Sequence, residues 1–168
     1  MRRWREVLVV GAALAGLAGP VAGQDAGIAV GAKAPAVSVD DLDGKPVDLA
    51  QFIGRKPVLL EFWATWCELC KELLPRVEAA HQEFGDRVEF IGVNVTVNQT
   101  PTRVRRYLAT DHPPFRTLYD DQGTSIRAYQ VPSTSYVVVV DAAGKVAYTG
   151  LGGTQDIAAV LRRVTEHR

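Results

Sequence analysis

Residues 61–75 read EFWATWCELCKELLP and hold both cysteines of the chain, Cys67 and Cys70. The residues PVLLEFWA, at 57–64, form an almost continuous apolar run, which is typical of a strand buried on both faces of a sheet. From Cys67 onward, apolar side chains recur at helical spacing as far as Phe84, and Gly85 is a stop signal for a helix. The stretch therefore predicts a buried strand that leads into a helix whose first turn carries both cysteines.

The rest of the sequence predicts a single α/β domain. The next apolar run, RVEFIGVNV, completes a strand–helix–strand unit with parallel strands. Asp43-Gly44 between apolar residues predicts an N-terminal β-hairpin extension. Further elements are expected in this order: a helix at 100–111, a short edge strand within 112–121, a short helix at 124–129, two hairpin strands within 133–150 and an amphipathic helix at 154–168. We expect a three-layer fold, with a mixed central sheet and helices on both faces.

The first 23 residues differ in composition from the rest. Arginines near the N-terminus precede an apolar run of about 12 residues, which is short for the ~20 residues of a membrane-spanning helix. Small residues follow, as in a secretory signal peptide. We expect residues 1–23 to be a signal peptide or an uncleaved anchor, 24–36 a Gly/Ala-rich linker and 37–168 the domain. The chain is then periplasmic, and either soluble after cleavage or anchored by its N-terminal segment.

The overall charge excludes one class of partner. Basic and acidic residues both number 19, so the formal net charge is zero. Nucleic-acid-binding domains normally carry a basic excess. We therefore expect no nucleic-acid partner.

The cysteine pair has three possible roles. A structural disulfide across two residues closes a very small loop, and so restricts the unfolded chain little. A closed zinc site needs about four ligands, but the chain has 3 histidines, dispersed along it, and no second Cys-x-x-Cys. We expect no metal, although a metal shared between two chains stays open. The third role, a redox centre, has a mechanism at this position.

At a helix start, unpaired backbone N–H groups and the helix dipole favour a thiolate. Cys67 is therefore predicted to be the attacking thiol, with a pKa below the ordinary value of about 8.5. Cys70, one turn along, is predicted to resolve the mixed disulfide and form a Cys67–Cys70 disulfide. Such chemistry needs no cofactor.

Glu61 is the candidate for moving the proton of Cys70. Its neighbours along the predicted strand are apolar, so burial is expected to raise the pKa of its carboxyl and to suit it as a proton acceptor. The alternative is that Glu61 reaches a water-filled cleft or a basic partner such as Lys71.

The segments LLEFWATWCELCKELLP and VPSTSYVVVVDAAGKVAYTGLGG resemble the thioredoxin superfamily. Within it, residues 34–168 look most like the exported TlpA/ResA-type thiol–disulfide oxidoreductases, some of which serve cytochrome c maturation. The resemblance implies a cis Val131–Pro132 peptide packed against the cysteines, with the backbone of Val131 pairing with a partner peptide. It also implies that Trp66 faces the partner. An ordinary trans proline and partial core packing of Trp66 are the respective alternatives.

The chain departs from the family pattern at two places. Leu69 stands where the family often has proline, and Leu73 stands where many relatives have glutamate. No redox potential is therefore carried over from the family.

The leading hypothesis is a monomeric, exported disulfide reductase. Its substrate is a disulfide-bearing partner protein, and a membrane electron donor reduces it again. A thiol peroxidase on the same fold is one alternative, and peroxide consumption without a protein substrate distinguishes it. The other is a binding or chaperone-like module in which redox is incidental, and its function survives loss of both cysteines.

Overall fold

The computed structural model describes residues 26–166, so the expected segment 1–23 lies outside the described residues. Seven strands form one sheet in the order β2-β1-β5-β4-β3-β6-β7. The elements are β1 (Ser38–Asp40), β2 (Pro46–Asp48), the 3-10 helix η1 (Leu49–Gln51), β3 (Val58–Trp63), α1 (Glu68–Phe84), β4 (Glu89–Val95), α2 (Pro101–Asp111), β5 (Arg116–Asp120), α3 (Thr124–Ala128), β6 (Tyr136–Val140), β7 (Val146–Leu151) and α4 (Ile157–Glu166). Within this part of the chain, no helix is both long and apolar enough to span a membrane.

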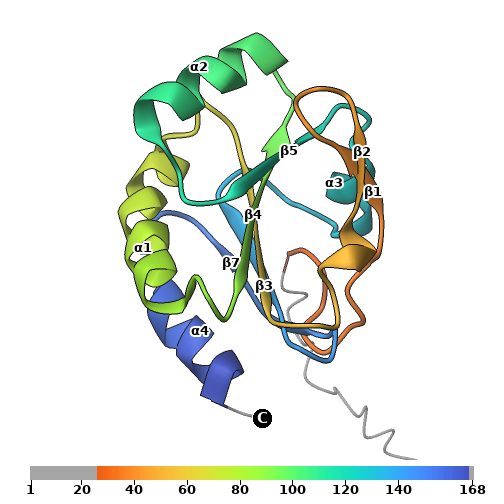
Figure 1. The fold of residues 1–168 in the computed structure, drawn as a ribbon, viewed down its shortest axis with the longest axis vertical. Helices are drawn as coiled ribbons and strands as arrows, with labels where there is room; N and C mark the ends of the chain where they lie inside the picture. Colours follow the sequence, from red (N-terminus) through yellow and green to blue (C-terminus); the bar gives the residue numbers. More distant parts are fainter. Residues whose placement is uncertain (1–25, 167–168) are drawn as a thin grey trace, which may run out of the picture.

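The sheet is mixed, as predicted. β3 and β4 run parallel, as do β4 and β5, while β6 runs antiparallel to β3 and β7 antiparallel to β6. Helices α1 and α4 pack together on one face of the sheet, and α3 lies on the other beside β1 (Figure 1). The expected three-layer α/β fold and its N-terminal hairpin, β1–β2, are therefore confirmed.

Strand β3 lies inside the sheet, between β4 and β6, and all six of its residues are buried. Leu60 and Phe62 point into the core cluster on the α3 face, whereas Leu59 packs against α1 and α4 on the opposite face. Alternation along a strand places Glu61 and Trp63 on the same face as Leu59. The strand thus delivers an acidic side chain to the α1 face.

Residues 26–36 differ from the loose linker expected there. The N–H of Ile28 donates to Tyr129 O at 3.2 Å, and the N–H of Gly31 donates to Val146 O at 2.7 Å. Ile28 and Ala34 are buried in the α3-face cluster. Small residues allow this arm to lie flat on the core, which is why their composition resembles that of a linker.

Strand β5 was expected at the edge of the sheet, and this is wrong. β1 covers it through one antiparallel pair, Asp40 opposite Tyr119. The hairpin β1–β2 thereby extends the sheet by two strands beyond β5.

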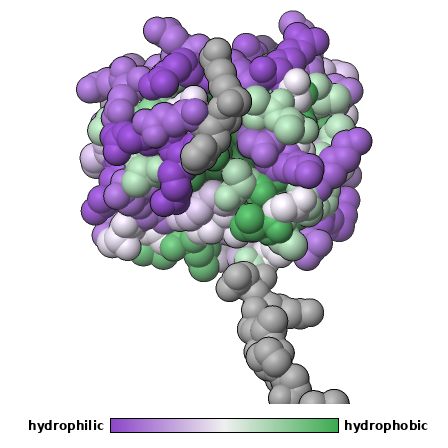
Figure 2. Space-filling view, turned by 90° about the horizontal axis from the view of Figure 1, so that it is seen from below, coloured by the Kyte–Doolittle hydropathy of each residue, from purple (hydrophilic) through white to green (hydrophobic). Residues whose placement is uncertain are grey.

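Figure 2 shows the end of the molecule farthest from α2, where β3 begins. Hydrophilic residues cover most of that visible surface, and hydrophobic residues gather in smaller areas. The cysteines follow β3, and so lie at the opposite end of the molecule.

Candidate active site

Cys67 and Cys70 lie together at the start of α1. A turn follows β3, in which the N–H of Cys67 donates to Ala64 O at 3.1 Å. Cys67 is the N-cap residue, and its Sγ accepts the N–H of Cys70 at 3.1 Å. The two sulfurs form a disulfide with an S–S distance of 2.08 Å. The helix thus directs its N-terminal N–H groups toward Cys67, the arrangement that stabilises a thiolate once the disulfide is reduced.

The acidic residue that follows Cys67 in the sequence is paired. Glu68 is the first residue of α1, and its Oε1 accepts from Lys71 Nζ at 2.8 Å. The negative charge of Glu68 would oppose a thiolate at Cys67, and the ammonium group of Lys71 offsets part of that effect. Lys71 is therefore engaged on the surface with Glu68 and does not form an ion pair with Glu61.

Both cysteines are mostly covered. They belong to a core cluster with Trp63, Val104 and others, where α2 packs over the end of β3. Trp66, directly before Cys67, is 41% exposed, so it is not a core residue. Leu69, between the cysteines, is 49% exposed.

Glu61 is buried beneath α1, with 2% of its surface exposed. Its Oε2 is enclosed and has no hydrogen-bond partner among residues 26–166. Burial raises the pKa of this carboxyl from 4.5 to about 8, because no nearby group compensates the desolvation of the charged form. The carboxyl can therefore exchange a proton near neutral pH.

Tyr107 is a residue of this region that the sequence analysis did not identify. The centroid of its ring lies 5.2 Å from the ring centroid of Trp63. Burial first, and then the charges of Asp111, Glu61 and Glu68, raise the pKa of Tyr107 to about 12. Its helical spacing from Val104, a buried position of α2, was the available signal that Tyr107 faces inward.

Two buried amides, Asn94 and Gln99, were also missed. Asn94 is the penultimate residue of β4, and Gln99 lies in the loop that follows this strand. Asn94 Nδ2 lies 3.4 Å from Trp63 O, and Gln99 Oε1 accepts the N–H of Thr65 at 3.1 Å. Polar residues at and just after the C-terminal end of β4 were the signal, since this end lies beside the C-terminal end of the parallel strand β3.

The predicted cis Val131–Pro132 peptide is wrong, because every described peptide bond is trans. The chain turns here instead through Gln130 and Ser135, whose φ angles are 52° and 61°. The N–H of Val131 donates to Ile126 O at 2.9 Å and closes the end of α3. Only the carbonyl oxygen of Val131 is therefore available for the expected pairing with a partner.

The loop that contains Pro132 nevertheless ends near the site. The N–H of Ser135 donates to Phe62 O at 2.8 Å, one residue before the end of β3. Val131 packs against the α3-face cluster, and Pro132 lines a shallow pocket with Tyr136 and β7. The structure thus brings Cys67, Cys70 and Trp66 together and places this loop at the same end of the sheet.

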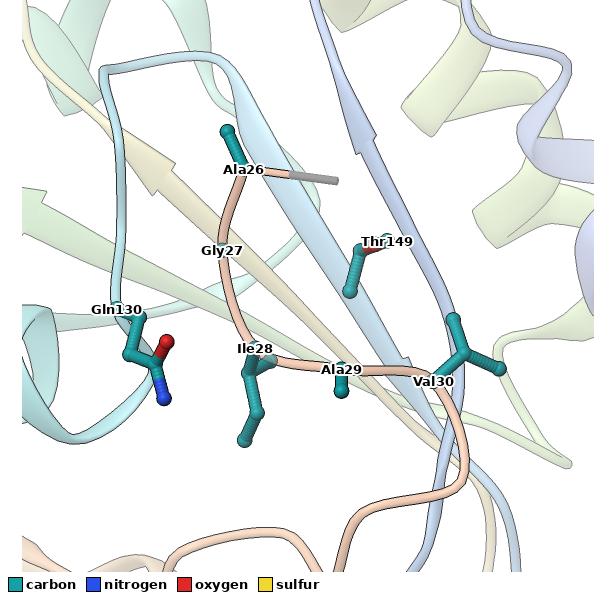
Figure 3. Close-up of a pocket in the computed structure, with 7 residues that line it drawn as sticks. All are labelled: Ala26, Gly27, Ile28, Ala29, Val30, Gln130 and Thr149. Carbon is teal, nitrogen blue, oxygen red and sulfur yellow. The ribbon is translucent and has the colours of Figure 1, made fainter. Parts of the chain in front are cut away.

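A pocket of about 630 Å³ lies elsewhere, between the arm Ala26–Val30, Gln130 and Thr149 of β7 (Figure 3). Its lining has one amide and one hydroxyl side chain and no ionisable group. Within residues 26–166, no cluster of three or more His, Cys, Asp or Glu side chains is placed to hold a metal ion. The redox-active chemistry of the described residues is therefore concentrated at the cysteine pair.

This chain is similar in sequence to known protein families and to individual known proteins. The family model described as Redoxin matches residues 29–162. "Thioredoxin-like protein YneN" of Bacillus subtilis (strain 168) is 33% identical over 122 residues, which cover 72% of this chain and 71% of that protein. "Thiol-disulfide oxidoreductase ResA" of Bacillus thuringiensis subsp. konkukian is 30% identical over 118 residues, covering 70% of this chain and 66% of that protein.

Solved structures agree on the fold. The thioredoxin domain of a thiol-disulfide oxidoreductase from Bacteroides vulgatus has a TM-score of 0.70 at 25% identity, and the match covers 82% of this chain and 99% of that one. A thioredoxin-family thiol:disulfide interchange protein from Chlorobium tepidum TLS has a TM-score of 0.68 at 24% identity, covering 82% and 99%. The thioredoxin-like architecture expected from the sequence is confirmed.

Proposed function

We propose that this chain, which belongs to the Redoxin family and is a thiol–disulfide oxidoreductase of the thioredoxin fold, reduces disulfide bonds of exported partner proteins. The single observation that carries the proposal is the Cys67–Cys70 disulfide at the N-terminus of α1. Electrons enter and leave through that bond.

Reduction of a partner proceeds in two exchanges. In the dithiol form, the thiolate of Cys67 attacks one sulfur of the partner disulfide, and the other partner sulfur leaves as a thiolate. Cys70 then loses its proton and attacks the sulfur of Cys67. The Cys67–Cys70 bond forms and the second partner sulfur leaves as a thiolate. The partner has gained two electrons, and this chain has been oxidised to the disulfide form described above.

Glu61 accepts the proton of Cys70 in the second exchange. Its pKa of about 8, which burial causes, lies close to that of a thiol, so transfer between the two groups is nearly balanced in energy. Its position on β3, on the face that α1 covers, supports this role. Trp66, the carbonyl of Val131, and Pro132 are the residues that we propose to contact the partner chain.

We further propose that the protein is exported and that a donor in the membrane supplies its electrons. Residues 1–23 have the composition of a secretory signal, and we infer a periplasmic location from it. An exported dithiol must be regenerated, so a membrane dithiol donor is proposed to reduce Cys67–Cys70 after each cycle. The protein acts as a monomer in this scheme.

The experiment is reduction of insulin by the reduced full-length protein. Cys67→Ser is expected to abolish it, and Cys70→Ser to trap a mixed disulfide with the insulin chain that a thiol reagent releases. Full activity of Cys67→Ser would contradict the mechanism. Peroxide consumption in the absence of any disulfide would favour a thiol peroxidase, and retained partner binding and biological function in the double Cys→Ala variant would favour a binding module.

A narrower substrate class is cytochrome c maturation, in which the partner carries a Cys-x-x-Cys-His haem-attachment segment. A disulfide peptide with that sequence is expected to be reduced faster than one in which alanine replaces its histidine. Equal rates would remove this refinement and leave the general reductase intact. The equilibrium potential of the pair completes the test, since about −270 mV suits a reductant and about −120 mV an oxidant.

A further inference from the structure

Large exposed hydrophobic side chains are concentrated at the end of the sheet that carries the disulfide. In the described part of the chain they are Val30, Trp66, Leu69, Val97 and Leu151. Trp66 and Leu69 follow β3, and Val97 follows the parallel strand β4, so the three lie at one end. Leu151 ends β7 at the same end, on the other flank of β3 beyond β6. Only Val30 lies elsewhere, next to Gly31, whose N–H donates to Val146 O at the start of β7.

The loop 96–99 is fastened to the turn that presents Cys67. Thr65 and Trp66 are the two central residues of the turn from Ala64 to Cys67. The backbone N–H of Thr65 donates to Gln99 Oε1 at 3.1 Å. The indole Nε1 of Trp66 donates to Val97 O at 2.8 Å. Both central residues of the turn are therefore bonded to the same loop.

Gln99 is the buried anchor of that loop. The side-chain Nε2 of Gln99 donates to Asn98 O at 2.8 Å. The backbone carbonyl oxygen of Gln99 accepts the hydroxyl of Tyr119 at 3.3 Å. Asn94 Nδ2 lies 3.4 Å from Gln99 Oε1. Asn98 has a left-handed backbone with φ of 55°, which turns the chain so that the side chain of Gln99 points inward. Such a network holds the loop in one position relative to the cysteines.

The result is an apolar platform beside the disulfide, made of Trp66, Leu69 and Val97. Trp66 and Leu69 are three residues apart at the start of α1, and the hydrogen bond to Val97 O draws the indole toward the loop. Val97 is 59% exposed. Glu68, which lies between Trp66 and Leu69 in the sequence, is paired with Lys71. The platform therefore offers contact area without a net charge.

The disulfide-exchange reaction indicates that the partner chain lies against this platform. A partner sulfur must come within bonding distance of Cys67 Sγ, so the residues next to the partner cysteine must lie on the surface around Cys67. We propose that the platform, locked in place by Gln99, selects partner segments that carry a large apolar side chain beside the reacting cysteine. This rests on the proposed function, and it names the substrate class of that same site.

The test compares three disulfides: a peptide with leucine beside each cysteine, the same peptide with glycine there, and glutathione disulfide. Val97→Ser is expected to lower kcat/KM for the leucine peptide by about 5-fold, because a partly buried apolar contact is lost, and to leave the rates for the glycine peptide and glutathione disulfide unchanged. Leu69→Ser also changes the sequence between the two cysteines, so its readout is the ratio of kcat/KM for the leucine peptide to kcat/KM for the glycine peptide. That ratio is expected to fall by about 5-fold. Val30→Ser, the matched exposed control, changes none of the three.

Gln99 is tested separately as a positioning residue. Gln99→Met keeps the side-chain volume but removes the amide bonds, and Trp66→Phe keeps a ring but removes the indole donor. Both variants are expected to raise KM for the leucine peptide, and Gln99→Met is expected to leave kcat with glutathione disulfide unchanged. If Gln99→Met fails to fold, Trp66→Phe carries this test alone.

The inference is overturned if Val97→Ser behaves like Val30→Ser or slows all three disulfides equally, or if Leu69→Ser leaves the ratio of leucine-peptide to glycine-peptide kcat/KM unchanged. It is also overturned if the parent protein reduces the leucine and glycine peptides at equal rates. Failure of the proposed function would be seen differently, as a parent protein that reduces none of the three disulfides.

Discussion

Glu61 stands directly opposite Gly92 across the parallel pair of strands β3 and β4. A side chain on Gly92 would collide with the ring of Phe115, since a Cβ there would come within 2.2 Å of it. The missing side chain thus admits an aromatic ring beside the carboxyl group, and Phe115 also lies 5.6 Å from the ring of Trp63. The apolar environment that raises the pKa of Glu61 is built partly by a glycine on the next strand.

The first prediction concerns stability and pH. With a pKa of about 8 in the folded oxidised protein and 4.5 when unfolded, Glu61 holds a proton in the folded state that the unfolded chain releases between these values. The free energy of unfolding therefore falls as pH rises through this window. Glu61→Gln removes this loss, and is expected to be about 2–4 kcal/mol more stable than the parent at pH 9, with little difference at pH 4. Urea unfolding at both pH values measures it, and an equal difference at both would contradict the assignment.

A second prediction concerns the rate of resolution. Glu61→Gln cannot accept the Cys70 proton, so the mixed disulfide should accumulate and release of the partner should slow at least ~10-fold. In the parent protein this rate rises with pH and levels off above about 8, as the carboxyl of Glu61 ionises. Acid-quenched single turnovers with a disulfide peptide, analysed by mass spectrometry, measure it. Glu83→Gln, at the far end of α1, is the control, and an unchanged rate in Glu61→Gln would remove the proton role.

Phe115 supplies a third prediction. Phe115→Ala should admit water to Glu61 and move the upper end of its pH window from about 8 toward 4.5. The variant also loses stability through the cavity, by about 3 kcal/mol, so the readout is the pH midpoint of the stability profile and not its height. Phe52→Ala is the matched control, because Phe52 packs against the core cluster on the opposite face. If both variants kept the midpoint of the parent, Phe115 would not be the cover of Glu61.

The fourth prediction is structural. Buried Asp120 ends β5 and accepts the N–H groups of Thr124, Ser125 and Ile126 at 2.7, 2.9 and 3.0 Å, and the hydroxyl of Ser125 at 2.6 Å. Asp120→Ala leaves these donors unpaired at the start of α3, and should cost about 2–4 kcal/mol of unfolding free energy. Asp121→Ala, on the exposed neighbour, should change it by less than about 0.5 kcal/mol. Chemical denaturation of both variants provides the comparison, and equal losses would show that the network is not responsible.

The fold was predictable where hydrophobic periodicity is strong. The continuous run of β3 and the helical spacing after Cys67 identified the central strand, α1 and the sheet type. The buried position of Glu61 also followed from alternation with Leu59 and Trp63. In each case the pattern lies within one element, so a single sequence contains the whole signal.

Structural features that depend on contacts between elements far apart in the sequence were not predictable from the sequence. The arm 26–36 is Gly/Ala-rich and has no period, and its burial depends on Tyr129 and Val146, more than 100 residues later. The roles of Gln99 and Phe115 likewise require the register of β3 against β4. At Pro132 the error had a different source. The resemblance to the thioredoxin superfamily implied a cis Val131–Pro132 peptide, but this peptide is trans.

Only two residues separate Cys67 from Cys70, and both sulfurs belong to one helical turn. Closing so small a ring is worth about 2 kcal/mol on the chain-entropy model, a minor share of the 5–15 kcal/mol typical of a domain. Loss or gain of the bond therefore leaves the architecture intact. The protein can therefore fold before its cysteines are reduced. It can also pass repeatedly between the dithiol and disulfide forms without unfolding.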